Sequence, residues 1–69
     1  METQRHYIGM FESNGVVLAM VRDGEFLIAG DSTNAGMIER YIYHIDDCYS
    51  IDENLELFVS EIDSEEDNL

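Results

Sequence analysis

Carboxylates are the side chains of this sequence best able to do chemistry, and they concentrate in its last third. From residue 46 onward no lysine or arginine interrupts them. The acidic residues of this segment are Asp46, Asp47, Asp52, Glu53, Glu56, Glu61, Asp63, Glu65, Glu66 and Asp67. The whole chain has 16 acidic residues against three basic ones, and its formal net charge is −13 over 69 residues. A small domain stays soluble with a net charge of roughly 2–8 in magnitude, so solubility alone does not require this excess. A field of this sign repels nucleic acid and anionic membranes and attracts basic surfaces.

Histidine and cysteine offer weaker signals for a reactive site. His6, His44 and Cys48 lack the paired spacing that zinc ligands have. His44 and Cys48 could form a base and a nucleophile only on a helix, and no third residue orients the histidine. The acidic segment also lacks the alternating ligands and central glycine of an EF-hand calcium loop. We therefore expect no catalytic residue, no specific metal site and no cofactor, and we expect that the protein is not an enzyme.

An amphipathic helix is predicted to position the carboxylates. Ser50 and Glu53 form a capping box, which marks the start of a helix. An apolar stripe at helical spacing follows it, made of Ile51, Leu55, Phe58, Val59 and Ile62. The helix is expected to run from about Ile51 to Asp63. The polar residues after it, 64–69, are expected to be a frayed acidic tail.

The predicted helix places its acidic residues in a definite order around its axis. Asp52, Glu56 and Asp63 lie along one flank of the apolar stripe, Glu53 lies further round, and Glu61 lies on the opposite flank. Asp52 and Glu56 are about one turn apart, near 6 Å, a spacing comparable to that of phosphates along a nucleic-acid strand. An ordinary solvated helix face is the alternative, but such a face normally includes lysines. Leu57 points away from the stripe among the acids, where it could anchor an interface.

The first part of the chain is predicted to be an antiparallel meander. Asn14-Gly15 and Asp23-Gly24 favour two-residue type I′ turns, and with such turns Arg22 would face Glu25. The β-favouring runs are His6 to Glu12, Val16 to Arg22 and Glu25 to Gly30. The segment from Met37 to Ile45 fits either a helix or a fourth strand, with the strand slightly favoured. The predicted fold is therefore α+β, with a three- or four-stranded β-meander and one C-terminal amphipathic acidic helix.

Both faces of the predicted sheet are apolar. One face carries Ile8, Met10, Val17, Ala19, Val21, Phe26 and Ile28, and the other carries Tyr7, Phe11, Leu18, Met20, Leu27 and Ala29. A sheet that is apolar on both faces needs cover on both, and with four strands a single helix covers only one. We therefore expect a homodimer through Tyr7, Phe11, Leu18, Met20 and Leu27. If residues 37–45 are a helix instead, they cover this face and a monomer suffices.

Length and composition indicate a single domain and a cytoplasmic location. Residues 1–63 are expected to form a single small domain. One cysteine cannot form an internal disulfide, which is typical of a reducing cytosol. The first residues lack the pattern of a secretory signal, and the longest apolar run, Val16 to Val21, is too short to span a bilayer. We expect a cytoplasmic protein that binds neither membranes nor nucleic acid directly.

The size, the charge and the acidic helix row together resemble those of small acidic inhibitor proteins encoded by phages. This class includes DNA mimics and some anti-CRISPR proteins, which occupy basic nucleic-acid channels. The resemblance rests on no specific motif and implies a stoichiometric inhibitor of a basic nucleic-acid-binding protein in the host cytosol. The residues expected to contact the partner are Asp46, Asp47, Asp52, Glu53, Glu56, Leu57, Glu61 and Asp63. The alternative is a small non-enzymatic adaptor or assembly subunit that associates through an apolar sheet face.

Overall fold

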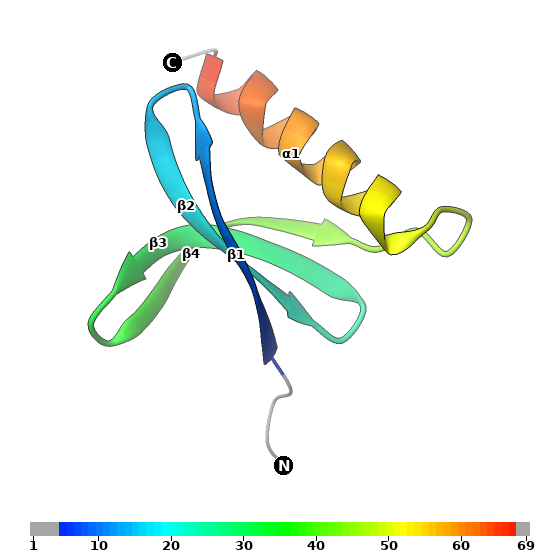
Figure 1. Cartoon of the computed structure of the whole chain (residues 1–69), viewed down its shortest axis with the longest axis horizontal. Coiled ribbons are helices and arrows are strands. Elements are labelled where there is room, and N and C mark those ends of the chain that lie inside the picture. The colour runs from blue at the N-terminus through cyan, green and yellow to red at the C-terminus, as the bar shows by residue number, and fades with distance from the viewer. Residues whose placement is uncertain (1–4, 68–69) are drawn as a thin grey trace.

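The fold is α+β, as predicted: a four-stranded antiparallel sheet followed by one helix (Figure 1). The computed structural model describes residues 5–67 of the chain. The strands are β1 (Arg5–Ser13), β2 (Val16–Asp23), β3 (Phe26–Thr33) and β4 (Gly36–His44), and the helix α1 is Ile51–Asp67. The strand order in the sheet is β1-β2-β3-β4, so β1 and β4 are its two edges. The fourth strand confirms the favoured reading of residues 37–45.

The two predicted hairpin turns have different outcomes. Asn14 and Gly15 both have positive φ, 51° and 87°, as a type I′ turn requires. The second turn instead centres on Gly24 and Glu25, since Asp23 pairs with Phe26 and only Gly24 has positive φ. The prediction that Arg22 faces Glu25 is wrong because a glycine in the first central position favours a type II′ turn. Arg22 faces Leu27 instead, and this shift of two residues leaves the side chains of β2 and β3 on their predicted faces.

The helix buries a row of residues spaced by four, rotated slightly from the predicted stripe. The buried members are Asn54, Phe58, Ile62 and Glu66, while Leu55 and Val59 pack at the margin of the core. Phe58 is 2% exposed and stacks on Tyr43 with ring centroids 5.4 Å apart. Ile51, which belonged to the predicted stripe, is 38% exposed. The helix continues to Asp67, four residues beyond its predicted end, so residues 64–67 are helical; residues 68–69 of the predicted tail lie outside the described part of the chain.

The helix covers the sheet face that was assigned to a homodimer, which corrects that expectation. Leu18, Met20 and Leu27 are 0–3% exposed and share one core with Phe58 and Ile62 of α1. Phe11 packs against the same core. Tyr7 does not belong to this face, because an irregularity between Tyr7 and Gly9 shifts the register and pairs Tyr7 with Val21. A bulge of this kind moves the side chains that precede it to the other face.

The opposite face of the sheet has no helix over it within residues 5–67, and it is strongly curved. Ala19 and Ile28 on this face are each only 4% exposed. The register of β3 and β4 shifts at Gly30, where an added Cβ would lie 2.0 Å from the backbone oxygen of Ile38. Arg5 bridges the curved face, pairing with Asp23 of β2 and with Glu39 of β4. The sheet therefore bends until its two edge strands are joined by one side chain.

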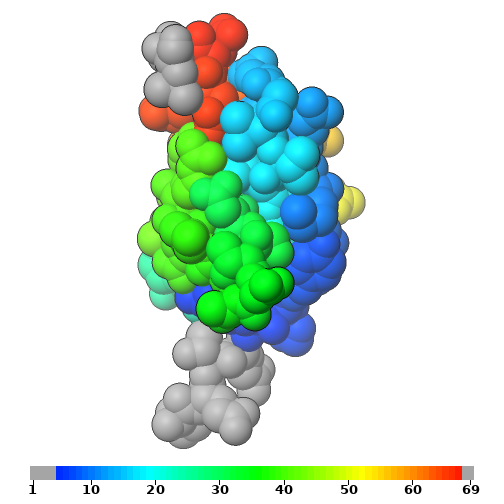
Figure 2. All heavy atoms as spheres, turned by 90° about the vertical axis from the view of Figure 1, so that its left-hand side faces the viewer, coloured from blue at the N-terminus to red at the C-terminus, as the bar shows by residue number. Residues whose placement is uncertain are grey.

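The helix crosses the other face diagonally, and both of its ends are attached by hydrogen bonds. Near its C-terminal end, the Asp63 carboxylate accepts from the Ser13 hydroxyl, and the Asp63 carbonyl accepts from Asn14 Nδ2 at 3.0 Å. Figure 2 shows this end of α1, in red, beside the tip of the β1–β2 hairpin, in cyan. Near its N-terminal end, Asn54 binds the backbone of Asp46 just after β4. The helix thus runs from the β4 edge to the β1–β2 turn.

Candidate partner-binding surface

The outward face of α1 carries exposed carboxylates at helical spacing. Asp52, Glu53, Glu56 and Asp67 are exposed there, while Glu61 and Glu65, which are also exposed, lie on the flank next to β4 and line a hollow with Arg40. Among the residues that the structure describes, none of these six carboxylates forms a salt bridge. A surface of this kind has a negative potential that nothing on the same face offsets.

The three arginines all lie on the sheet and are engaged there. Arg5 is held by Glu39 and Asp23, and the hydrogen bonds that it donates to these two carboxylates raise the pKa of its guanidinium. Arg22 donates from Nε to the Gly24 carbonyl at 3.0 Å. The third, Arg40, pairs with acidic residues on the helix side of the sheet, as described below. The cations of residues 5–67 therefore lie away from the outward face of α1.

Several of the predicted contact residues have structural tasks of their own. Glu53 accepts from the Ser50 backbone at 2.9 Å while its own N–H donates to Ser50 Oγ at 3.2 Å, which confirms the capping box. The carboxylate of Asp46 accepts from the Cys48 N–H at 2.9 Å in the loop before the helix. Asp63 is bound to the β1–β2 turn. Of the predicted row, Asp52 and Glu56 remain without such contacts among the described residues.

Leu57 lies on the outward face, 43% exposed, beside a shallow hollow. The hollow is lined by Tyr49, Glu53, Glu56, Leu57 and Ser60. Tyr49, from the loop before the helix, is itself 49% exposed. An aromatic ring and a leucine between carboxylates give a partner both an apolar anchor and a charged rim, the arrangement found at the centre of many interfaces.

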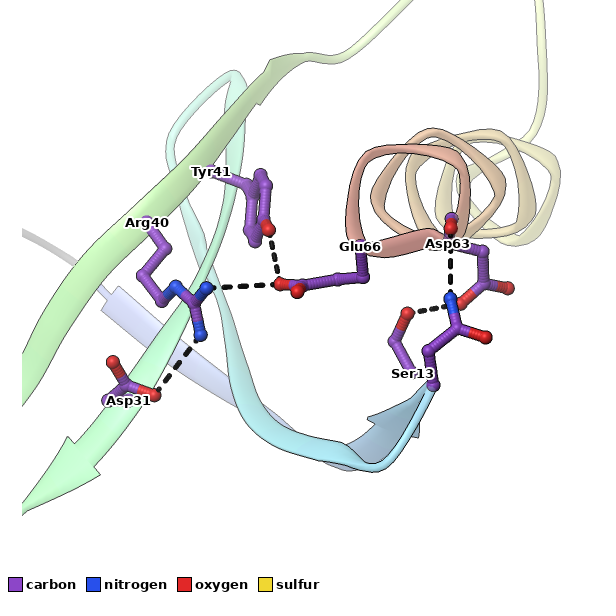
Figure 3. A network of polar contacts seen from close by, with 7 residues as sticks. Ser13, Asp31, Arg40, Tyr41, Asp63 and Glu66 are labelled. Carbon is purple, nitrogen blue, oxygen red and sulfur yellow. Dashed lines mark hydrogen bonds and ion pairs between the residues drawn. The ribbon is translucent and has the colours of Figure 1, made fainter. Parts of the chain in front are cut away.

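A buried polar network that no motif in the sequence predicts lies at the end of α1 (Figure 3). Glu66, with a side chain 1% exposed, accepts a hydrogen bond from the Tyr41 hydroxyl and pairs with Arg40 at 3.1 Å. Arg40 also lies 3.6 Å from Asp31. The register of β4 shifts at Arg40, and such a bulge lets both Arg40 and Tyr41 reach the helix. The hydrogen bond to Glu66, together with burial, raises the pKa of Tyr41.

The only feature of the sequence that could have predicted the burial of Glu66 is the row of helix positions spaced by four residues. Glu66 follows Asn54, Phe58 and Ile62 at that spacing, and a continued stripe would have placed it toward the sheet. A charged residue at the end of an acidic run gives no reason to expect burial, since glutamate is rarely buried unless it is paired. Within residues 5–67, the second carboxylate oxygen of Glu66 has no hydrogen-bond partner.

The histidine and cysteine residues do not assemble into a site. His44 Nε2 lies 2.9 Å from a Glu25 carboxylate oxygen, and its ring packs edge-on against Phe26. Cys48 is exposed. Its hydrogen bond with Asp46 and the negative charge of that carboxylate both raise the pKa of the Cys48 thiol. A raised pKa makes a cysteine a poorer nucleophile at neutral pH. No group of three potential metal ligands comes together within residues 5–67.

The residues expected to bind a partner divide into three groups: an exposed set on α1, a set engaged in holding the fold, and Asp47 in the exposed loop before α1.

The helix that the structure describes is too short and too polar to cross a bilayer.

No protein-family model matches this chain, and neither a curated protein nor a solved structure matches it.

Proposed function

We propose that this protein is a stoichiometric inhibitor that binds a basic, nucleic-acid-binding protein through an acidic surface that mimics nucleic acid. The observation that carries this proposal is the charge distribution. The helix α1 has six exposed carboxylates without a salt bridge in the described chain, four of them on its outward face, while the three arginines lie on the sheet. Asp52 and Glu56 lie at the centre of the proposed contact, and Leu57 supplies an apolar anchor.

The array, and no single pair, would supply the affinity and the speed of binding. One exposed ion pair contributes roughly 0.2–1 kcal/mol. Several such pairs on a rigid helix add up, and the field of the whole protein accelerates encounter with a basic partner. A phage anti-CRISPR or similar anti-defence role is the biological setting that we propose for such an inhibitor.

The test compares two double variants that each remove two negative charges. Asp52→Asn with Glu56→Gln neutralises the proposed contact and leaves the capping box intact. Glu12→Gln with Glu25→Gln, both exposed on the sheet hairpins, is the matched control. Each protein is immobilised and exposed to the heparin-binding fraction of a bacterial lysate, and the association rate of each captured protein is then measured against ionic strength, with DNA and RNA as competitors.

The proposal expects the helix variant to associate more slowly and with a flatter salt dependence than both the wild type and the control variant. It also expects nucleic acid to displace the partner. If both double variants behave alike, or if nucleic acid binds the complex unhindered, the outward face of α1 is only a solvated surface.

A second candidate function is a small adaptor or assembly subunit, and the uncovered sheet face favours it. Tyr7, Met10, Val17, Phe26 and Ile42 are 39–65% exposed, and the registers of their strands place them on this face. Exposed apolar residues in one area are typical of an interaction surface. Association through this face would be insensitive to salt, whereas binding through the carboxylates would weaken steeply as salt rises.

A further inference from the structure

We propose that the outer edge of β1 and the adjoining flank of α1 form a groove that binds an extended segment of a partner protein, in which lysine or arginine alternates with apolar residues. The segment would add to the sheet as a fifth strand. This inference deepens the proposed function, on which it rests for the basic character of the partner.

The diagonal course of α1 creates the groove. Asp63 holds the C-terminal half of the helix against Ser13 and Asn14, at the end of β1. Asn54 holds the N-terminal half next to Asp46, at the opposite edge of the sheet. The helix therefore diverges from β1 toward the start of that strand, and the two elements enclose a wedge-shaped space. Figure 1 shows the helix close to the β1–β2 tip at one end and close to the end of β4 at the other.

The floor of the groove is apolar. A hollow of about 250 Å³ lies between β1 and α1. Its lining consists of Ile8, Gly9, Met10, Phe11, Met20, Leu55 and Val59. Ile8 is 42% exposed, so this floor is accessible from outside.

The wall of the groove on the helix side is acidic. A second hollow along α1 is lined by Leu55, Glu56, Val59, Ser60 and Asp63. Leu55 and Val59 line both hollows, so the apolar floor adjoins the hollow that Glu56 lines. Long basic side chains suit such a surface, because their methylene stems cover apolar residues while their charged ends reach the carboxylates.

The edge of β1 supplies the third element of recognition. In the described sheet β1 pairs only with β2, so one side of its backbone faces outward. An edge strand offers unpaired N–H and C=O groups to an added strand. Because side chains alternate along a strand, one set of the added residues would face Leu55, Val59 and Glu56, and the other would extend the open face next to Met10. Alternating basic and apolar residues satisfy both.

Charge decides against a second copy of this chain as the occupant. Each copy carries a net charge of −13, and pairing two β1 edges would bring two acidic helices close together. Between Arg5 and Ser13, β1 has only one arginine, Arg5, and that side chain is held by Asp23 and Glu39. A segment rich in lysine or arginine instead gains from the same field that repels a second copy.

The test uses the full chain and a blocked peptide of alternating valine and lysine. Calorimetry measures the affinity, and amide hydrogen exchange identifies the binding edge. We expect binding to slow exchange along β1 and to leave the β4 edge unchanged. Methylating one alternate set of peptide amides should abolish binding, while methylating the other set should preserve it. A valine–glutamine peptide should bind about tenfold more weakly, the loss expected when several exposed ion pairs are removed together.

Matched protein variants separate this groove from the rest of the acidic face. Glu56→Gln should weaken peptide binding, whereas Glu61→Gln on the opposite flank should weaken it less. The proposal would be overturned if the peptide does not bind measurably, or if Glu56→Gln and Glu61→Gln weaken its binding equally. It would also be overturned if binding does not slow exchange along β1, if both methylated peptides still bind, or if the protein self-associates. If the peptides behave as expected and nucleic acid never competes with a captured protein, the groove stands and the proposed function fails. If a captured protein competes with nucleic acid but does not slow amide exchange along β1, the proposed function stands and the groove proposal fails.

Discussion

The side chain of Asn54 binds both backbone groups of Asp46: its Oδ1 accepts from the Asp46 N–H at 2.8 Å, and its Nδ2 donates to the Asp46 carbonyl at 3.0 Å. The same amide nitrogen lies 3.3 Å from the Tyr49 carbonyl and 2.9 Å from the Ser50 carbonyl. Asn54 is 0% exposed. One buried amide therefore fixes the loop between β4 and α1, and with it the direction in which the helix leaves the sheet.

Replacing Asn54 with alanine should lower the free energy of unfolding by about 3 kcal/mol, because several buried backbone groups lose their partner and each unsatisfied group costs roughly 1–3 kcal/mol. Ser60→Ala, an exposed change on the same helix, should stay within about 0.5 kcal/mol of the wild type. Urea denaturation followed by circular dichroism gives both values. Equal stability of the two variants would show that the loop does not depend on Asn54.

Phe58 and Leu57 are neighbours in sequence with opposite surroundings, and they make a matched pair. Phe58→Ala should destabilise the protein by about 3–5 kcal/mol because it empties the centre of the core. Leu57→Ala removes a side chain that is 43% exposed and should cost less than about 1 kcal/mol. Thermal denaturation of both variants checks the ranking, and a similar melting temperature for the two would contradict the core assignment.

Gly30→Ala should destabilise the protein by more than about 3 kcal/mol, the upper end for overpacking a closely packed site. The added methyl group would meet the backbone of Ile38, which cannot move aside as a flexible side chain can. Gly9→Ala is the control, since a Cβ at Gly9 meets nothing within 4 Å. Soluble yield and urea denaturation of the two variants test this. A fully stable Gly30→Ala protein would mean that the sheet can flatten at this point.

Stability should decline as the pH rises above about 10, the ordinary pKa of a tyrosine. The pKa of Tyr41 is raised by its hydrogen bond to Glu66 and by burial. The folded protein holds this proton more tightly than the unfolded chain does, so the stabilisation is complete below the unfolded pKa and is lost as the pH rises through the folded one. Tyr41→Phe should show a shallower decline in urea denaturation over this range. Tyr7→Phe, which changes a side chain that is 65% exposed, should keep the wild-type profile. A steep decline that Tyr41→Phe leaves unchanged would contradict this assignment.

Cys48 should react slowly with iodoacetamide despite its exposure, because only the thiolate reacts and the pKa of this thiol is raised by Asp46. The reaction rate should increase with pH along a curve displaced to higher pH than that of free cysteine. Asp46→Asn removes the negative charge and should move the curve back toward lower pH. A rate at neutral pH above that of free cysteine would mean that Cys48 is activated.

Local signals in the sequence account for most of the fold. Asn14-Gly15 predicted its turn because both residues tolerate positive φ. Ser50 and Glu53 predicted the start of the helix because their mutual hydrogen bonds depend only on three residues of spacing. The alternation of apolar residues in β2 and β3 predicted both faces correctly, since a register shift of two residues preserves the side-chain pattern.

What the sequence could not predict depends on contacts between distant segments. The bulge that moved Tyr7 to the other face lies next to Gly9, and an isolated glycine in a strand suggests a bulge but does not fix the new register. Glu66 is buried because Arg40 and Tyr41, which lie some 25 residues earlier, reach it from β4. Asn54 reads as an ordinary polar helix residue until the loop that it binds is known. The acidic face of α1 was predictable from composition, but the attachment of Asp63 to Ser13 was not, because these residues are 50 positions apart.

The helix α1 follows all four strands in the sequence, and this order matters while the protein is being synthesised. All three hairpins connect strands that are adjacent in sequence, so the sheet can begin to form while the ribosome is still at work. Its apolar face, however, waits for Phe58 and Ile62, which leave the ribosome only after every strand. During that interval Leu18, Met20 and Leu27 are exposed to water. A chain that ends before residue 58 is therefore expected to leave this apolar face uncovered, and exposed apolar surface of this kind promotes aggregation.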